Sequence, residues 1–298
     1  MTVNGGFTNN GTLTLFGSPG DTLKVTGTLT NNAGATLTLL ANSGDMANIN
    51  ALSNSGVFNI NGGTANIGAV SNSGTVSISA GTVLNVTGAG SKYTQTAGTT
   101  TDDGSFTLPS GGALSLNSGS LFGRGTITGA VTSSGTITPG DSSATTGILT
   151  EKGAYTQNFA GVLDMSIGGT TVGAQFDQFT ITGKASLNGA LNVAEINGFT
   201  PTSGETFDIV NFASKAGAFS SCNGHSGGTT CTINSTEHFL VEYNPTNVTL
   251  KVVPGASSVT LAGTPEPSTL LMLGSGGLLL LAHLRGRERQ SKDQGQSL

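Results

Sequence analysis

Apolar residues alternate with hydroxylated or amide residues along most of the chain before Gly255. Clear examples are Thr12–Leu15, Thr36–Leu39 and Thr75–Ile78, in which every second residue is Leu, Val or Ile. Successive side chains of a strand point to opposite faces, so this period of two predicts short strands with one apolar and one polar face. Gly- and Asn-rich turns precede these strands. The pattern therefore predicts an all-β fold with many tight corners.

The strands belong to a repeated unit in which Asn-x-Gly precedes the alternating residues. The unit occupies residues 9–15, 32–39, 54–60 and 72–78, with a weaker copy at 133–137. In this alignment Gly34 is the counterpart of Gly11, Gly56 and Gly74. The glycines recur at intervals of roughly twenty residues, the length of one coil in a solenoid.

A single unit of this kind cannot bury its apolar face. Stacking each unit on the one before it buries a continuous apolar column and pairs every strand with its neighbours. Asn and Thr at matching positions can then form side-chain ladders along the axis. We therefore expect a right-handed parallel β-helix (β-solenoid). An antiparallel sandwich is the alternative, because short strands joined by frequent turns also suit that fold.

The composition narrows the class of protein further. The chain has 298 residues with 47 Gly, no Trp and only 9% charged residues, whereas soluble helices need charged side chains on their wet face. Disorder of the main body is the competing interpretation. The net charge of only −5 and the regular apolar positions argue against it. The few basic residues before position 285 form no footprint for nucleic acid, so no such partner is expected.

Residues 151–253 differ from the repetitive solenoid predicted for residues 1–150. Their strands lengthen and aromatic residues become frequent, while Tyr155-Thr156-Gln157 echoes Tyr93-Thr94-Gln95. We expect this segment to continue the solenoid with wider coils and to close it, because an open last coil would expose an unpaired strand edge. Residues 254–264, rich in small side chains, are the expected linker.

Several segments between residues 120 and 253 resemble the β-helix repeats of autotransporter passenger domains. They include Gly123-Arg124-Gly125-Thr126-Ile127, Gly135-Thr136-Ile137-Thr138-Pro139-Gly140-Asp141 and Leu187-Asn188-Gly189-Ala190-Leu191. The resemblance is good over residues 120–253 and extends to residues 1–119 by style of repeat only. The membrane translocator of that family has no counterpart in this sequence. The resemblance implies a parallel β-helix body.

The end of the sequence has three features in order. They are the motif Pro265-Glu266-Pro267, an apolar run over residues 270–284, and the cluster Arg285, Arg287 and Arg289. This order resembles the PEP-CTERM sorting signal of exopolysaccharide-producing Gram-negative bacteria. That resemblance implies that a membrane exosortase recognises the motif and removes the hydrophobic segment, so that the body is released or passed to a surface anchor.

The tail is also consistent with membrane insertion on physical grounds. As a helix, residues 268–284 would span about 25 Å, slightly less than a hydrocarbon core of ~30 Å. The arginines would hold the C-terminal side in the cytoplasm and leave the body on the far side. A buried core helix is the alternative, but arginines closing a terminal apolar run fit a core poorly. We expect a single hydrophobic transmembrane helix within residues 265–290, followed by a disordered cytoplasmic tail at 291–298.

Cys222 and Cys231 lie in a loop rich in Gly, Ser and Thr. In an oxidising compartment their pairing would close a short loop and stabilise the fold by about 3 kcal/mol. Free thiols are the alternative. The two cysteines and His225 supply too few ligands for a metal ion, and we expect neither a metal nor a cofactor.

Possible catalytic residues have a simpler structural interpretation. The run Gly224-His225-Ser226-Gly227-Gly228 matches the nucleophile-elbow pattern, which needs a strand-to-helix turn plus acid and base partners, whereas this run lies inside the loop between Cys222 and Cys231. Asp102 and Asp103 are adjacent and so should face opposite sides of a strand. The remaining candidates are expected at solvated strand positions, or at a strand edge in the case of the histidine: Asp164, Asp177, Glu195, Asp208 and His238. No enzyme is expected.

These patterns favour an exported structural or adhesive protein of the cell surface or extracellular matrix, with the exosortase, the membrane and exopolysaccharide as partners. It would be inserted in the inner membrane before processing. The alternatives are a glycan-binding or glycan-cleaving β-helix enzyme, or a spacer stalk for a missing N-terminal domain. Residues 1–6 have neither the basic start nor the apolar core of a signal peptide, so export would require a leader upstream of this reading frame.

Overall fold

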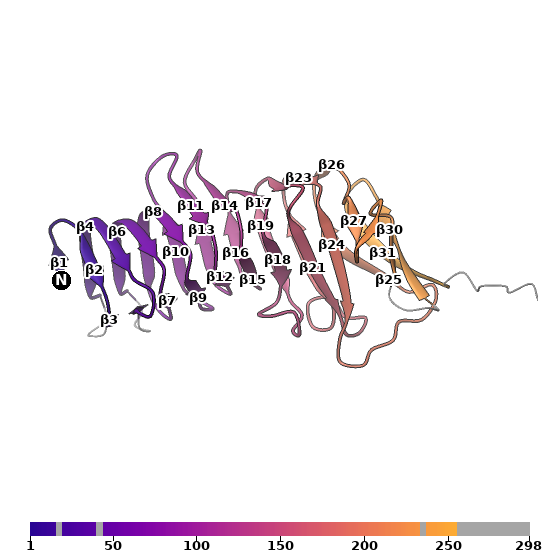
Figure 1. Ribbon diagram of the computed structural model, residues 1–298, viewed down its shortest axis with the longest axis horizontal. Coiled ribbons are helices and arrows are strands. Elements are labelled where there is room, and N and C mark those ends of the chain that lie inside the picture. Colours follow the sequence, from indigo (N-terminus) through magenta and orange to yellow (C-terminus); the bar gives the residue numbers. More distant parts are fainter. Residues whose placement is uncertain (16–19, 40–43, 233–236, 255–298) are drawn as a thin grey trace, which may run out of the picture. The chain divides into compact units, whose positions relative to one another are not determined.

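The computed structural model describes residues 1–15, 20–39, 44–232 and 237–254. These belong to one compact unit, Met1–Ala256, and the second unit, Ser257–Leu298, lies outside the described residues. The described residues contain strands and turns and no helix. Most strands pair in parallel, coil upon coil, in the order of the chain (Figure 1). The predicted all-β class is therefore confirmed.

Each coil contributes strands to three faces. Face one contains β1 (Thr2–Val3), the first halves of β4 (Thr22–Asn31), β6 (Met46–Asn54) and β8 (Thr64–Asn72), then β10 (Val83–Val86), β13 (Ser105–Thr107), β16 (Thr126–Thr128), β19 (Ile148–Lys152), β22 (Gln178–Ile181) and β25 (Thr206–Asn211). Face two contains β2 (Phe7–Asn9), the second halves of β4, β6 and β8, then β11 (Lys92–Gln95), β14 (Ala113–Leu116), β17 (Ala130–Ser133), β20 (Tyr155–Gln157), β23 (Lys184–Leu187) and β26 (Ser214–Gly217).

Face three forms a sheet of its own. It contains β3 (Thr12–Leu15), β5 (Thr36–Leu39), β7 (Val57–Ile60), β9 (Thr75–Ile78), β12 (Thr99–Asp102), β15 (Ser120–Gly123), β18 (Thr136–Pro139), β21 (Val162–Ile167), β24 (Ala190–Glu195) and β27 (Ser221–Cys222). The last strands are β28 (His225–Ser226), β29 (Thr230–Thr232), β30 (Glu237–Tyr243) and β31 (Asn247–Pro254).

The first four strands of face three have the bounds and the parallel pairing that the repeated unit predicts. Leu37, Phe58 and Val76 pair in register and are completely buried. Leu13 is only partly buried, since Leu37 covers it from one side. Stacked parallel coils are incompatible with an antiparallel sandwich, so that alternative is wrong for this part of the chain.

A ladder of buried amides occupies the corner between faces two and three. Asn9 donates a side-chain hydrogen bond to Asn31 at 2.8 Å, Asn31 to Asn54 at 2.7 Å, and Asn54 to Asn72 at 2.8 Å. Gln95 accepts the next bond, at 3.4 Å. Each asparagine also donates to a backbone carbonyl one coil further on. Buried amides are thus satisfied along the axis of the stack.

The structure corrects the alignment of the second repeat by one residue. Thr36 pairs with Thr12 and Val57, so Ala35, and not Gly34, precedes the strand. The ladder residue of this coil is likewise Asn31, and Asn32 bonds to Asn10 on the exposed side. The turn before β5 holds four residues, two more than the turns before β3 and β7, and Gly34 adopts a φ of 80° within it.

Coil length varies along the stack. Asn54 and Asn72 are 18 residues apart, whereas Ser220 bonds to the carbonyl of Gly189, 31 residues earlier. The parallel pattern then ends: β31 pairs antiparallel with β25 and with β30, which pairs antiparallel with β29. Phe207 packs edge-to-face on Phe239 at a centroid distance of 6.0 Å. Antiparallel strands therefore cover the edge of the last parallel coils.

Candidate functional site

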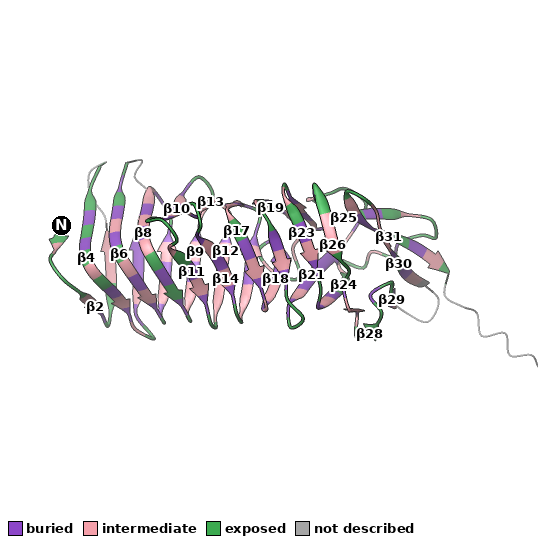
Figure 2. Cartoon of the chain, turned by 90° about the horizontal axis from the view of Figure 1, so that it is seen from above, coloured by how far each residue is buried: buried purple, intermediate pink, exposed green. Residues whose placement is uncertain are grey.

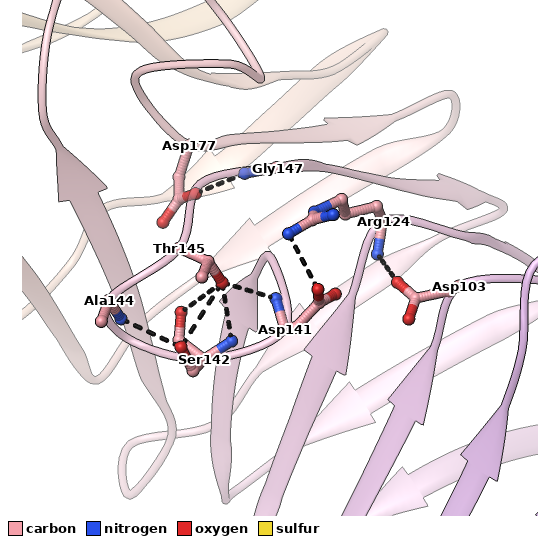
Figure 3. Close-up of polar contacts among 8 residues, drawn as sticks. All are labelled: Asp103, Arg124, Asp141, Ser142, Ala144, Thr145, Gly147 and Asp177. Atoms are coloured by element: carbon pink, nitrogen blue, oxygen red, sulfur yellow. Dashed lines mark hydrogen bonds and ion pairs between the residues drawn. The ribbon is translucent and has the colours of Figure 1, made fainter.

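Charged side chains from three successive coils meet where face three turns into face one (Figure 3). Asp103 follows β12, Arg124 follows β15 and Asp141 follows β18. The Arg124 guanidinium pairs with the Asp141 carboxylate at 2.8 Å, and the Arg124 backbone N–H donates to Asp103 Oδ1 at 3.1 Å. Equivalent corner positions stack directly in a solenoid, which explains why residues so far apart in sequence meet here.

This corner cluster of Asp103, Arg124 and Asp141 is only partly withdrawn from solvent. The Arg124 and Asp141 side chains are 46% and 44% exposed, and exposed ion pairs contribute little to stability. Partial burial raises the pKa of Asp103, against the backbone hydrogen bond from Arg124, and the negative charge of Asp141 raises it further. The arrangement ties three coils together.

A hollow of about 420 Å³ adjoins the cluster and is open to solvent. It is lined by Arg124, residues 144–146, Gly173, Ala174 and Asn197. Within the turn that follows Asp141, the Thr145 hydroxyl accepts hydrogen bonds from the backbone N–H groups of Asp141 and Ser142. Of the lining side chains Arg124 alone is charged, and its partner is already Asp141. In the described part of the chain, no three His, Cys, Asp or Glu side chains are placed to hold a metal ion.

Asp177 lies beside the cluster but is not at the solvated strand position expected for it. It is completely buried between β21 and β22, where its carboxylate accepts a hydrogen bond from the backbone N–H of Gly147 at 2.8 Å (Figure 3) and another from the backbone N–H of Ser166 at 2.7 Å. Burial raises its pKa to about 7. The prediction failed because these N–H groups belong to the turn before β19 and to β21, and the period of a single strand does not show which backbone groups lie near a side chain.

The remaining acidic candidates are placed as follows. Asp102 is completely buried and Asp103 is half-buried, which confirms that they face opposite sides. Burial raises the pKa of Asp102 to about 7. Asp208 is exposed, and Asp164 and Glu195 are partly exposed. The three do not join the corner cluster.

Glu151 is a buried carboxyl group that the analysis of the sequence missed. It is completely buried in β19, between Ile127 and Ile181 of the neighbouring coils, and neither oxygen has a hydrogen-bond partner. Burial raises its pKa to about 9, so the group is protonated at neutral pH. The signal was present, because the period of two that points Leu149 inward does the same for Glu151.

A disulfide joins Cys222 and Cys231, whose Cα atoms lie 4.9 Å apart. Both are completely buried in the region that covers the last coils. The elbow-like run lies between them, with His225 and Ser226 exposed on β28, which pairs antiparallel with β27. No described helix follows Ser226, so the strand-to-helix context of a nucleophile elbow is not present in the described residues.

His238 is not at a strand edge as expected. It lies in β30 and pairs with Thr232 of β29 on one side and with Val253 of β31 on the other. The error arose because a local sequence does not reveal how many strands flank a given one. His238 is therefore an interior position of the closing antiparallel strands.

The proposed sorting residues Pro265, Glu266 and Pro267 and the arginines at 285, 287 and 289 lie outside the described residues. Among the residues that are described, no helix is long and apolar enough to cross a membrane.

Comparison of the sequence with protein-family models and with curated proteins finds no match. Inference about function therefore depends on the residues themselves and on how the described coils place them.

Proposed function

We propose that the protein is an exported structural and adhesive component of a cell surface or extracellular matrix. The observation that carries this proposal is the stack of parallel coils whose outward positions are mostly uncharged hydroxyl and amide side chains. On face three, Thr14, Asn59, Ser77 and Thr101 lie partly exposed in one row on the side opposite the core, and Thr38, the member of the row between Thr14 and Asn59, is buried. Such a face offers repeated weak hydrogen bonds, which add up when a polymer touches many of them.

The interior supports a stiff scaffold. The amide ladder and the parallel pairing join each coil to the next, and in stacked repeats stability spreads through such nearest-neighbour contacts. We propose that the coils wind as a right-handed β-helix, the hand favoured when parallel strands of one sheet are joined.

Sorting is the second part of the proposal. The motif Pro265-Glu266-Pro267, the apolar residues 270–284 and the arginines would act as a PEP-CTERM signal. The two prolines cannot donate backbone hydrogen bonds and disfavour helix in the residues before them, which would keep the motif extended for an exosortase. The apolar residues would form the transmembrane helix, with the arginines on the cytoplasmic side.

Cell fractionation tests this proposal. The full gene is expressed in a host that has an exosortase and in the same host with that enzyme deleted. We expect the protein in the surface and extracellular fractions of the first host and in the inner membrane of the second. The same cytoplasmic location in both hosts would contradict the proposal.

A further inference from the structure

A groove crosses the outer surface of the first coils where face one bends into face two. It has a volume of about 840 Å³. Its lining comes from neighbouring strands of three coils and from one turn: residues 24–26 of β4, 48–51 of β6, Asn66, Gly68 and Ala69 of β8, and Thr87, Gly88 and Ser91. Exposed positions lie side by side on β4, β6 and β8 (Figure 2). The groove is thus a feature of the coils and not of a loop.

The groove is hollow because the strands pass through the corner without a protruding turn and carry small side chains there. β4, β6 and β8 serve both faces continuously, whereas the next coil breaks into β10 and β11, with residues 87–91 forming a wall. Ala51 and Ala69 form the floor beside Gly68. A Cβ on Gly68 would lie 2.1 Å from the Asn50 carbonyl oxygen, so the backbones approach too closely for any other residue.

A row of amides begins on one side of the groove with Asn48 and Asn66 and continues beyond the lining to Asn85 on β10. Asn66 donates to Asn48 Oδ1 at 3.0 Å, and Asn85 donates to Asn66 Oδ1 at 3.0 Å. Each of these bonds uses one of the two N–H groups of the donor amide, which leaves the second N–H and further acceptor capacity for a ligand. The three residues are partly exposed. Neighbouring amides repeat at the strand spacing of about 4.8 Å, so they offer a regular series of donors and acceptors along the stack.

We propose that this groove binds an extended, uncharged polysaccharide that lies along the stack of coils. The proposal rests on the surface function above and names the site through which it would operate. Amide groups match the hydroxyl groups of sugars as both donors and acceptors. Lys24 is the one charged residue of the lining, so the groove could neutralise little of the charge of an ionic polymer.

A peptide strand fits the groove less well. The backbone groups of β4, β6 and β8 are already paired with neighbouring coils, so no sheet edge is free for an added strand. The floor of Ala and Gly residues also offers no pocket for the alternate side chains of a peptide.

Affinity electrophoresis of the full chain in mild detergent tests the proposal, with gels that contain hydroxyethylcellulose, dextran or alginate. We expect the extended neutral hydroxyethylcellulose to retard the protein most. Asn66→Ala should weaken this binding about fivefold, the effect of losing roughly one hydrogen bond. Ala69→Arg should abolish it by filling the groove. The matched control is Asn117→Ala, an exposed amide in the turn after β14 and outside the lining of the groove, which should leave the retardation unchanged.

Circular dichroism spectra and melting curves must first show that each variant is folded. Retardation by alginate alone would overturn the claim that the ligand is uncharged. If neither hydroxyethylcellulose nor dextran retarded the protein, the claim that the groove binds a neutral glycan would be wrong. Equal loss of binding in Asn117→Ala and Asn66→Ala would place the site elsewhere. Each of these results leaves the fractionation experiment unaffected, so failure of the groove and failure of surface sorting are distinguishable.

Discussion

The side-chain amide of Asn31 donates a hydrogen bond of 2.7 Å to Asn54, one coil further along the stack, and both residues are buried away from solvent. Asn54 in turn donates to Asn72. A buried amide without partners costs far more than a hydrogen bond contributes, so the ladder makes the fold depend on each of its members.

Asn54→Ala should therefore lower the free energy of unfolding by about 3 kcal/mol, because in the buried ladder Asn31 loses the acceptor of one amide N–H and Asn72 loses a donor to its Oδ1. Denaturant titration followed by circular dichroism measures the change. The control is Asn59→Ala on the outer side of the same coil, expected to change stability by less than about 0.5 kcal/mol. Equal effects of the two substitutions would contradict a structural role for the ladder.

Gly74→Ala should be strongly destabilising, whereas Gly11→Ala should be tolerated. Both glycines precede a strand of face three, but a Cβ on Gly74 would lie 2.1 Å from the Gly56 carbonyl oxygen, and one on Gly11 would meet nothing within 4 Å. Relief of the clash requires a shift of the backbone, which costs about 2 kcal/mol or more. Thermal melting of the two variants checks the difference, and similar melting temperatures would be inconsistent with the stacking described.

Stability should fall as the pH rises, because of Glu151. Its pKa is raised from 4.5 to about 9 in the folded protein, so the unfolded chain loses this proton at a much lower pH than the folded one. Between these pKa values the folded state binds more protons, and one such group lowers stability by about 1.4 kcal/mol per pH unit at most. Asp102 and Asp177 each have a pKa raised from 3.8 to about 7, so they add to the loss of stability per pH unit between pH 3.8 and about pH 7.

Melting temperatures measured from pH 4 to pH 9 test this expectation. Glu151→Gln keeps the shape but cannot ionise, so it should raise stability at pH 8 and flatten the profile. The control Asp21→Asn, at an exposed position, should leave the slope in place. A slope that Glu151→Gln does not alter would exclude Glu151 as its source.

Removal of the disulfide should loosen the closing strands. The double variant Cys222→Ala/Cys231→Ala is expected to lose about 3 kcal/mol on the chain-entropy estimate. Hydrogen exchange should show earlier opening of β29 and β30 than of β7 and β9, since the substitution touches only the end of the stack. Unchanged exchange in β29 would argue against a stabilising role of this bond.

The proposed sorting signal makes a separate prediction about processing. In a host with an exosortase, mass spectrometry of the mature protein should find a C-terminus that lacks residues 270–284. Glu266→Ala should retain them, while Glu205→Ala in the body serves as the control and should be processed normally. If every wild-type molecule keeps residues 270–284, the segment is a plain membrane anchor.

The sequence alone was sufficient for the all-β class and for the first four strands of face three. The alternation in Thr36–Leu39 and Thr75–Ile78 is local, and repetition of a unit that cannot bury its own apolar face implies stacking. The period of two over residues 148–151 also predicts that Glu151 points inward. The general rule that charged groups stay in water argues against that prediction, so the sequence alone did not identify Glu151 as buried.

Only the tertiary structure decided the features that depend on which coil lies next to which. The register of the second coil depended on two extra residues in the turn before β5, so that Asn31 and not Asn32 joined the ladder. Arg124 forms an ion pair with Asp141, and the Asp177 carboxylate accepts hydrogen bonds from the N–H groups of Gly147 and Ser166. These contacts join coils of unequal length. The groove arose because β4, β6 and β8 pass through a corner that later coils break. Alternation specifies what one strand does with its two faces, whereas coil length and corner geometry determine which side chains become neighbours.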